Sequence, residues 1–222
     1  MEAFTTHRGH VALLDWTDVN TDLIIPARYL KRIERTGYGP LLFADKRYVA
    51  GGAPEVDTPE QQGAYEATFP LNNPHFKGAS ILVVGKNFGC GSSREHAVWA
   101  VSQAGYRVLI APGKHEGFAD IFEQNSFNNG LLPIELPEAD WRAIAGAVAA
   151  HPTLEATVNL EASTITVHQP EGKSTSYSFE IPSEQRKRLL AGLDAIAETL
   201  LIADSISRHE QSAPAWVTPA AS

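Results

Sequence analysis

The sequence has only one cysteine, Cys90, among its 222 residues. One thiolate cannot form an intrachain disulfide, and it cannot by itself ligate a zinc ion or an iron–sulfur cluster. The eight histidines are scattered, and none of them follows a metal-binding spacing. We therefore expect this chain to bind no metal of its own.

The sequence also lacks a long hydrophobic run and an excess of positive charge. No stretch reaches about 18 apolar residues, the length that a membrane-spanning helix needs. The first residues do not show the basic and then apolar order of a secretory signal. The net charge of −8 and the absence of a broad Lys/Arg surface argue against nucleic acid as a partner. These features predict a cytoplasmic protein that binds neither a membrane nor nucleic acid.

The composition, with 43% apolar and 20% charged residues, is that of a folded globular chain. Short apolar runs alternate with helical patterns up to residue 150, which is typical of a parallel α/β core. Residues 154–181 alternate apolar and polar side chains and predict an antiparallel meander. Residues 183–205 predict one helix whose leucine and isoleucine stripe packs on the core, with Ser183 as its N-cap. We expect a single domain over residues 1–205 and a disordered tail over residues 206–222.

The expected elements of the parallel core can be stated by range. The strands are residues 11–14, 80–85, 106–111 and 131–134, and the helices lie near residues 92–104, 116–125 and 138–150, with residues 120–125 ambiguous between helix and loop.

A glycine-rich turn at residues 85–97 is the most informative part of the chain. Gly85, Gly89 and Gly91 allow positive φ values and let a ligand approach the backbone closely. Three known glycine motifs do not fit. A P-loop ends in Gly-Lys-Ser/Thr, a dinucleotide fingerprint needs a small residue where Arg94 stands, and a nucleophile elbow needs a second glycine close behind its serine.

The polar residues of this turn indicate an anion site. Ser92 stands where a helix N-cap is expected, and Glu95 three residues later completes a capping box. The unpaired N–H groups of the first helical turn attract an anion, and Arg94 offers a planar fork to a carboxylate. A helix cap without a ligand is the simpler alternative. Two serines, an arginine and three glycines in one turn exceed what capping requires, so we favour recognition of a small carboxylic acid.

Two further residues of the turn have alternative interpretations. A nearby helix terminus can lower the thiol pKa of Cys90, but no paired base is identifiable, so we favour a packed loop residue over a nucleophile. His96 lies one helical turn after Ser92, where a core or capping role is commoner than a base. The most basic stretch of the chain is residues 28–38, which we interpret as a solvated helix face or as a lid over the anion site.

Several segments together resemble the swivelling domain of the aconitase family. The strongest is residues 91–97, and the resemblance extends from about residue 11 to residue 134. The other segments that match are residues 18–26, 69–72, 118–126 and 129–134. Membership implies an α/β fold, with a swivelling β/β/α domain built on a mixed sheet with flanking helices.

The resemblance also implies a reaction and roles for particular residues. Members of this family dehydrate a hydroxy acid and rehydrate it with the hydroxyl on the neighbouring carbon, and a serine of the swivelling domain moves the carbon-bound proton. Here Ser92 matches that serine. Ser93 and Arg94 match residues that hold substrate carboxylate, and Asp22 matches an acidic residue that borders the site. Lys31 or Arg32 fills the place of a family arginine.

The family's cofactor and partner follow from the same resemblance. A 4Fe–4S cluster with one open iron acts as a Lewis acid in these enzymes. Because Cys90 is the only cysteine, we expect the cluster on a large partner subunit and expect this chain to act only in a heterodimer. The expected substrate is a malate with an isopropyl side chain, used in leucine biosynthesis, with apolar contact from Tyr29, Leu30 and Ile33. The alternatives are homoaconitate, citraconate or 2,3-dimethylmalate, or a non-catalytic binding module.

Overall fold

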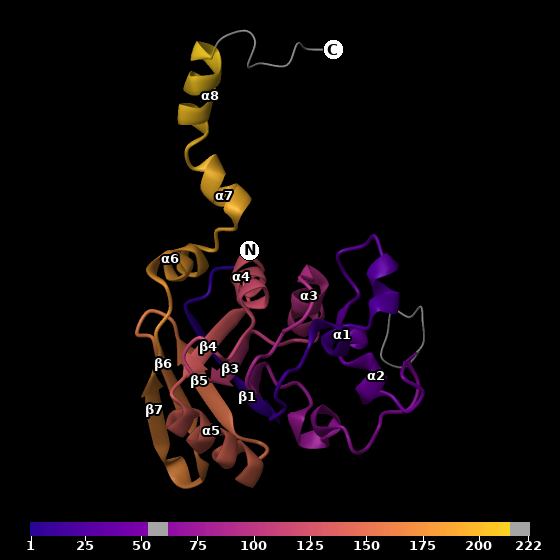
Figure 1. The fold of residues 1–222 in the computed structure, drawn as a ribbon. Helices are drawn as coiled ribbons and strands as arrows, with labels where there is room; N and C mark the ends of the chain where they lie inside the picture. The colour runs from indigo at the N-terminus through magenta and orange to yellow at the C-terminus, as the bar shows by residue number, and fades with distance from the viewer. Residues whose placement is uncertain (53–61, 214–222) are drawn as a thin grey trace.

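Seven strands form one mixed sheet in the computed structural model, which describes residues 1–52 and 62–213 (Figure 1). The strand order is β4-β3-β2-β1-β5-β6-β7. The first four strands of this order pair in parallel, and the pairs from β1 to β7 are antiparallel. The strands are β1 Thr6–Leu14, β2 Ile81–Val84, β3 Val108–Pro112, β4 Leu132–Leu136, β5 Glu155–Asn159, β6 Thr164–His168 and β7 Ser174–Ser178.

Strand β1 joins the two halves of the sheet. Its residues 6–10 pair antiparallel with β5, and its residues 11–14 pair in parallel with β2. Strand β2 is buried along its whole length, as expected for a parallel strand that is covered on both faces. Strands β5 and β6 alternate buried and half-buried residues, because one face of the meander packs on the core. The predicted mixed α/β sheet with flanking helices is confirmed.

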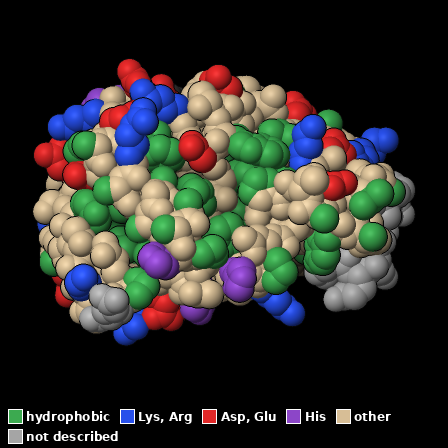
Figure 2. All heavy atoms as spheres, turned by 90° about the horizontal axis from the view of Figure 1, so that it is seen from below, with side chains coloured by type: hydrophobic (Ala, Val, Ile, Leu, Met, Phe, Trp, Pro, Cys, Tyr) green, Lys and Arg blue, Asp and Glu red, His purple; other side chains and the backbone are tan. Residues whose placement is uncertain are grey.

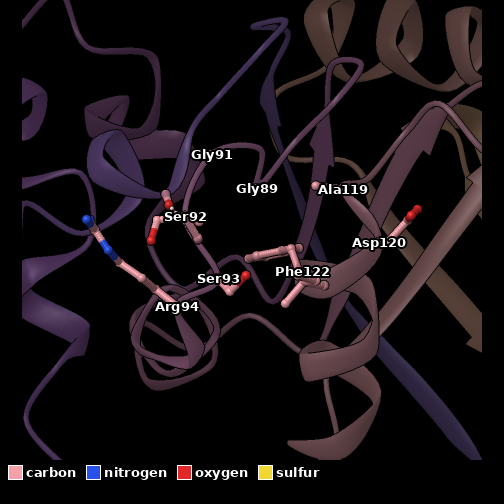
Figure 3. A pocket seen from close by; sticks show the side chains of 10 residues that line it. Gly89, Gly91, Ser92, Ser93, Arg94, Ala119, Asp120 and Phe122 are labelled. Carbon is pink, nitrogen blue, oxygen red and sulfur yellow. Dashed lines mark hydrogen bonds between the residues drawn. The ribbon is translucent and has the colours of Figure 1, made fainter.

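Three helices follow the parallel strands in the chain. Helix α3 (Glu95–Gln103) contacts α4 (Asp120–Asn128), and α5 (Glu138–Ala150) packs on β1 and β3. Since parallel strands end at the same edge of a sheet, the loops that lead into α3 and α4 meet there. The shorter elements are helices α1 Thr21–Ile24 and α2 Ala44–Arg47, which lie near α3 in Figure 1, and 3-10 turns at Ala27–Lys31, Gly39–Leu41, Pro70–Asn72, Pro74–Phe76 and Pro170–Gly172.

The C-terminal part of the chain differs from the sequence-based expectation. The single helix predicted over residues 183–205 is wrong, because α6 (Ser183–Ala191) ends at Gly192 in the left-handed conformation. Its N-cap is Pro182, so the predicted cap at Ser183 is also wrong. Helix α7 (Ala195–Leu200) then follows, and its N-cap is Asp194, whose side chain accepts from the Ala197 N–H at 2.8 Å.

The predicted apolar stripe of this segment does not pack as a unit. Leu189 is fully buried, whereas Ile196 and Leu201 are 74% and 70% exposed. Helix α8 (Ala203–Ser212) extends away from the sheet in Figure 1 and covers the start of the segment, residues 206–222, that is expected to be disordered. Residues 214–222 of that segment lie outside the described residues, and the boundary between a single domain and a disordered tail stays a prediction.

Among the described residues, the face shown in Figure 2 has no broad Lys/Arg surface, as expected from the sequence. On the face shown in Figure 2, Lys and Arg side chains lie mostly near the edges, often beside acidic ones, and hydrophobic side chains are scattered between. Within the described residues, no helix is long and apolar enough to cross a membrane. The cytoplasmic location and the absence of nucleic-acid binding stay predictions.

Trp141 connects helix α5 to the end of β2 and gives a test of this packing. Its indole Nε1–H donates to the Val84 carbonyl at 2.9 Å inside the core. Trp141→Phe leaves that carbonyl unpaired, so we expect the free energy of unfolding in urea to fall by about 1–3 kcal/mol. Trp16→Phe is the control, because the Trp16 indole packs on Phe69 and has no hydrogen-bond acceptor among the described residues. Equal losses in the two variants would contradict a specific role of the Val84 bond.

Candidate active site

The loop that follows β2 requires glycine at one position in particular. Gly89 has a φ of +81°, and a Cβ built on it would lie 2.2 Å from Cγ of Phe122. No other residue fits there without moving the Phe122 ring, which comes from helix α4. Gly91 also has a positive φ, of +96°. The backbone thus turns sharply just before Ser92, and the turn packs directly against α4.

Backbone contacts fix the same loop to the segment that follows β1. The Gly89 N–H donates to the Val19 carbonyl at 2.7 Å, and the Thr21 N–H donates to the Cys90 carbonyl at 2.8 Å. The Thr21 hydroxyl donates to the Ser92 carbonyl at 3.0 Å. Asn20 holds the segment itself, since its side chain accepts from the Leu23 N–H at the start of α1. The polar segment near Asn20 therefore supports the loop that carries Ser92 and Ser93, which we call the serine loop.

Helix α3 begins later than the sequence indicated. Its first residue is Glu95 and its N-cap is Arg94, which makes no side-chain cap hydrogen bond, so the predicted capping box of Ser92 and Glu95 is wrong. The Glu95 carboxylate instead accepts from Asn129 Nδ2 at 2.9 Å. Ser92 and Ser93 remain in the loop and are exposed. Their hydroxyl groups therefore have no capping role in α3.

These serines open into a hollow of about 230 Å³ between two helix starts. In Figure 3, Arg94 extends to one side of the loop and Asp120 lies on the opposite side, with Ser93 and Phe122 between them. Because α3 and α4 both begin here, the unpaired N–H groups and positive dipole ends of two helices are close to the hollow. The lining residues are Thr21, Gly89, Gly91, Ser92, Ser93, Arg94, Ala119, Asp120, Ile121 and Phe122.

Arg94 is the principal cation of this hollow. Its side chain is only 20% exposed, and its guanidinium forms an ion pair and hydrogen bond with Asp22, which is 54% exposed. Asp22 holds the guanidinium at the hollow. Because the Asp22 carboxylate is the more exposed of the two groups, the carboxylate of a ligand can displace it from Arg94. The structure therefore brings together Ser92, Ser93, Arg94 and Asp22, which the sequence had selected.

Lys31 and Arg32 lie apart from this group. Neither lines the hollow; Lys31 is exposed, and the Arg32 guanidinium lies 5.8 Å from the ring centre of Tyr38. Their contact with a substrate stays a prediction.

Some lining residues were not selected from the sequence. Asp120, Ile121 and Phe122 belong to the first turn of α4, a segment that sequence patterns left ambiguous between helix and loop. Thr21 belongs to residues 18–26, which match the family, but the sequence gave it no role. For Asp120, Ile121 and Phe122 the sequence offered only the family resemblance of residues 118–126, which does not indicate which side chains face the hollow.

Cys90 and His96 are packing groups of the turn. Burial, and then the charge of Asp18, raise the pKa of the Cys90 thiol, so the lowered pKa considered from the sequence is wrong. Burial lowers the pKa of His96, whose ring centre lies 5.5 Å from that of Tyr38 and 4.8 Å from that of Trp99. His96 is therefore a neutral ring packed among aromatic side chains at pH 7.

This chain does not fit an iron–sulfur cluster. Cys90 is its only cysteine, and the described residues contain no group of three or more His, Cys, Asp or Glu side chains placed to hold a metal ion.

Comparison with known proteins agrees with this fold. Residues 1–139 match the model of the aconitase C-terminal domain. The chain is 45% identical over 217 residues to the 3-isopropylmalate dehydratase small subunit of Bacillus licheniformis, covering 98% of this chain and 99% of that protein. It is 46% identical over 224 residues to the protein of the same name from Desulforapulum autotrophicum, covering 98% of each.

A solved structure has the same fold. The crystal structure of 3-isopropylmalate dehydratase (leuD) from Methanocaldococcus jannaschii aligns with a TM-score of 0.58 at 24% identity, over 93% of this chain and 99% of that one. The chain therefore belongs to the aconitase C-terminal domain family and, within it, to the 3-isopropylmalate dehydratase small subunits. The family resemblance and the swivelling-domain fold expected from the sequence are confirmed.

The close contact of Gly89 with Phe122 gives a test of the site's construction. Gly78 has a similar φ of +77°, and a Cβ there would meet nothing within 4 Å. Gly78→Ala should lower the free energy of unfolding by about 1–2 kcal/mol, the cost of a left-handed alanine. Gly89→Ala should lose clearly more, because the Phe122 ring must also move. Equal losses in urea denaturation would show that the contact does not constrain the loop.

Proposed function

We propose that this chain is the small subunit of a 3-isopropylmalate dehydratase and that its serine loop forms one half of the active site. The complete enzyme interconverts 2-isopropylmalate and 3-isopropylmalate by dehydration and rehydration, a step of leucine biosynthesis. The proposal rests on full-length relatives that carry this name and on one observation in the structure. Ser92, Ser93 and Arg94 line a single hollow at the start of two helices.

The substrate is a dicarboxylate, and the hollow has the charge to bind one of its ends. Arg94 takes a substrate carboxylate in place of Asp22, and Ser93 adds a hydroxyl donor. The N–H groups at the starts of α3 and α4 add to the positive potential. This arrangement orients the substrate so that its reacting carbons lie next to Ser92.

Ser92 acts as the acid–base group in this proposal. In the dehydration direction the deprotonated Oγ takes the carbon-bound proton, the electron pair of that C–H bond forms the double bond, and the hydroxyl leaves the adjacent carbon as hydroxide. The proton on Oγ then passes to this hydroxide, so that one water is released. In rehydration water gives a proton to Oγ, Ser92 passes it to one carbon, and the hydroxide that remains adds to the other. Serine is a weak base, so the N–H groups of its turn and Arg94 must stabilise the negative charge on Oγ.

The other half of the site belongs to a large subunit in this proposal. The residues of this chain do not fit a 4Fe–4S cluster, so the cluster, whose Lewis acidity would assist departure of the hydroxyl, is assigned to the partner. We expect the isolated small subunit to be inactive and the heterodimer to be the working enzyme.

The basic loop at residues 28–38 is proposed to contact the substrate side chain. Leu30 is half-buried and Ile33 is 94% exposed, so both can offer apolar contact to an isopropyl group. Tyr29 cannot do so as expected from the sequence, because it is 1% exposed and its ring lies under the Arg28 guanidinium at 4.5 Å.

Replacing Ser92 tests its proton-transfer role. In the complex with the large subunit, Ser92→Ala should lower kcat for 3-isopropylmalate by about 10²–10⁴-fold, the usual contribution of a general base. Complex formation, measured by gel filtration, should be unchanged. Ser102→Ala is the matched control, because Ser102 donates to the Val98 carbonyl within α3 and is remote from the hollow. A Ser92→Ala complex that retains wild-type turnover would overturn the assignment.

Replacing Leu30 tests substrate choice. Leu30→Arg adds a cation that can pair with a third carboxylate, so the ratio of kcat/KM for isopropylmalate to that for citrate should fall by about tenfold or more. Val49→Arg adds the same charge at an exposed position outside this loop and should leave the ratio unchanged. Unchanged preference in Leu30→Arg would contradict a role of this loop in selecting the side chain.

A further inference from the structure

The end of the basic loop forms a tight turn that is closed by a side chain from helix α3. Gln103 Nε2 donates to the Arg35 carbonyl at 2.7 Å, and Gln103 Oε1 accepts from the Tyr38 N–H at 2.8 Å. In an ordinary β-turn, the carbonyl of the first residue and the N–H of the fourth bond to each other. Here the Gln103 amide lies between those two groups. We call this pair of hydrogen bonds the Gln103 bridge.

The turn is also held by aromatic packing. Tyr38 is fully buried, and its ring centre lies 5.5 Å from the ring centres of both His96 and Trp99. Two arginines of the loop lie over these rings: Arg32 at 5.8 Å from the Tyr38 centre and Arg35 at 5.8 Å from the Trp99 centre. His96 has no assigned role in the reaction, and its ring forms part of the surface on which Tyr38 packs.

The backbone of the turn touches the end of the helix directly. A Cβ built on Gly39 would lie 2.5 Å from the Gln103 carbonyl oxygen, so only glycine permits this approach. The loop is thus joined to α3 through the Gln103 bridge, the Tyr38 ring and the Gly39 backbone. In Figure 1 the segment that carries α1 and α2 lies beside α3, in agreement with these contacts.

Helix α3 links this turn to the active-site hollow. The helix starts directly after Arg94 and ends at Gln103. A helix of this length is a stiff element, so an anchor at Gln103 fixes where the loop lies relative to the carboxylate-binding arginine. Leu30, which is half-buried, and Ile33, which is 94% exposed, lie in the part of the loop that comes before this anchored turn.

We infer that Gln103 and Tyr38 are positioning residues that hold the basic loop in the conformation that receives the substrate side chain. This inference rests on the proposed function. Without the bridge, the loop samples other conformations and only a fraction of molecules are competent to bind. The apparent affinity falls by that fraction, while the chemical step at Ser92 is untouched once substrate is bound.

Gln103→Ala tests the inference in two ways. In the complex with the large subunit, KM for 3-isopropylmalate should rise by about tenfold, as for a loop that is competent about one tenth of the time, and kcat should change less than about twofold. In the full-length chain alone, trypsin should cut after Arg32 and Arg35 about tenfold faster, as followed by mass spectrometry. Gln103 is exposed, so the variant is expected to fold.

Two further variants separate positioning from general damage. Gln103→Glu can still accept from the Tyr38 N–H but cannot donate to the Arg35 carbonyl, so it should give intermediate KM and cutting rates. Gln211→Ala makes the same change as Gln103→Ala at an exposed position on α8 and should match wild type.

The possible results distinguish a failure of this inference from a failure of the proposed function. Wild-type cutting rates in Gln103→Ala would show that the bridge does not order the loop. Faster cutting with unchanged KM, or with a loss confined to kcat, would overturn the positioning role. If the wild-type complex uses citrate or another malate instead, the proposed substrate is wrong, and the KM comparison is made with the acid that it does use.

Discussion

The site depends on one close approach, in which the backbone at Gly89 passes against the Phe122 ring without a side chain between them. This approach brings the loop after β2 against the start of α4, and the Val19 and Cys90 backbone contacts hold it to the segment after β1. Three connections at one edge of the parallel sheet therefore fix the position of two serines. A loop with so many backbone restraints can present Ser92 and Ser93 without using them for capping.

Local charge, more than net charge, suits the hollow to an acid. The chain carries a net charge of −8, yet Arg94 and two helix starts converge at this point. Asp22 pairs with Arg94 and holds its guanidinium in place. Helix α3 connects this end of the site to Gln103, where the basic loop is anchored. Helix α3 thus connects the proposed carboxylate-binding end of the site to the proposed side-chain end.

Much of the fold and the serine loop could be predicted from sequence, because they depend on local patterns. Apolar runs predicted the buried strands, and the signature around Ser92, Ser93 and Arg94 indicated residues that line one hollow in the structure. The capping box failed because Arg94, not Ser92, is the N-cap, and a pattern of residue types cannot show where the backbone turns into the helix. Contacts of α4 with the loop, the Gln103 bridge and the exposure of Ile196 depend on tertiary packing, which periodicity does not report.

The most direct test of this account is to mix the purified chain with a reconstituted large subunit that carries the cluster, and to follow formation of the unsaturated acid from 3-isopropylmalate. The account predicts a stable complex with turnover in the mixture and none in either subunit alone. A stable complex that acts only on citrate or another malate would contradict the substrate assignment. If the two subunits form no complex, the chain is not half of a split active site, and the central claim is wrong.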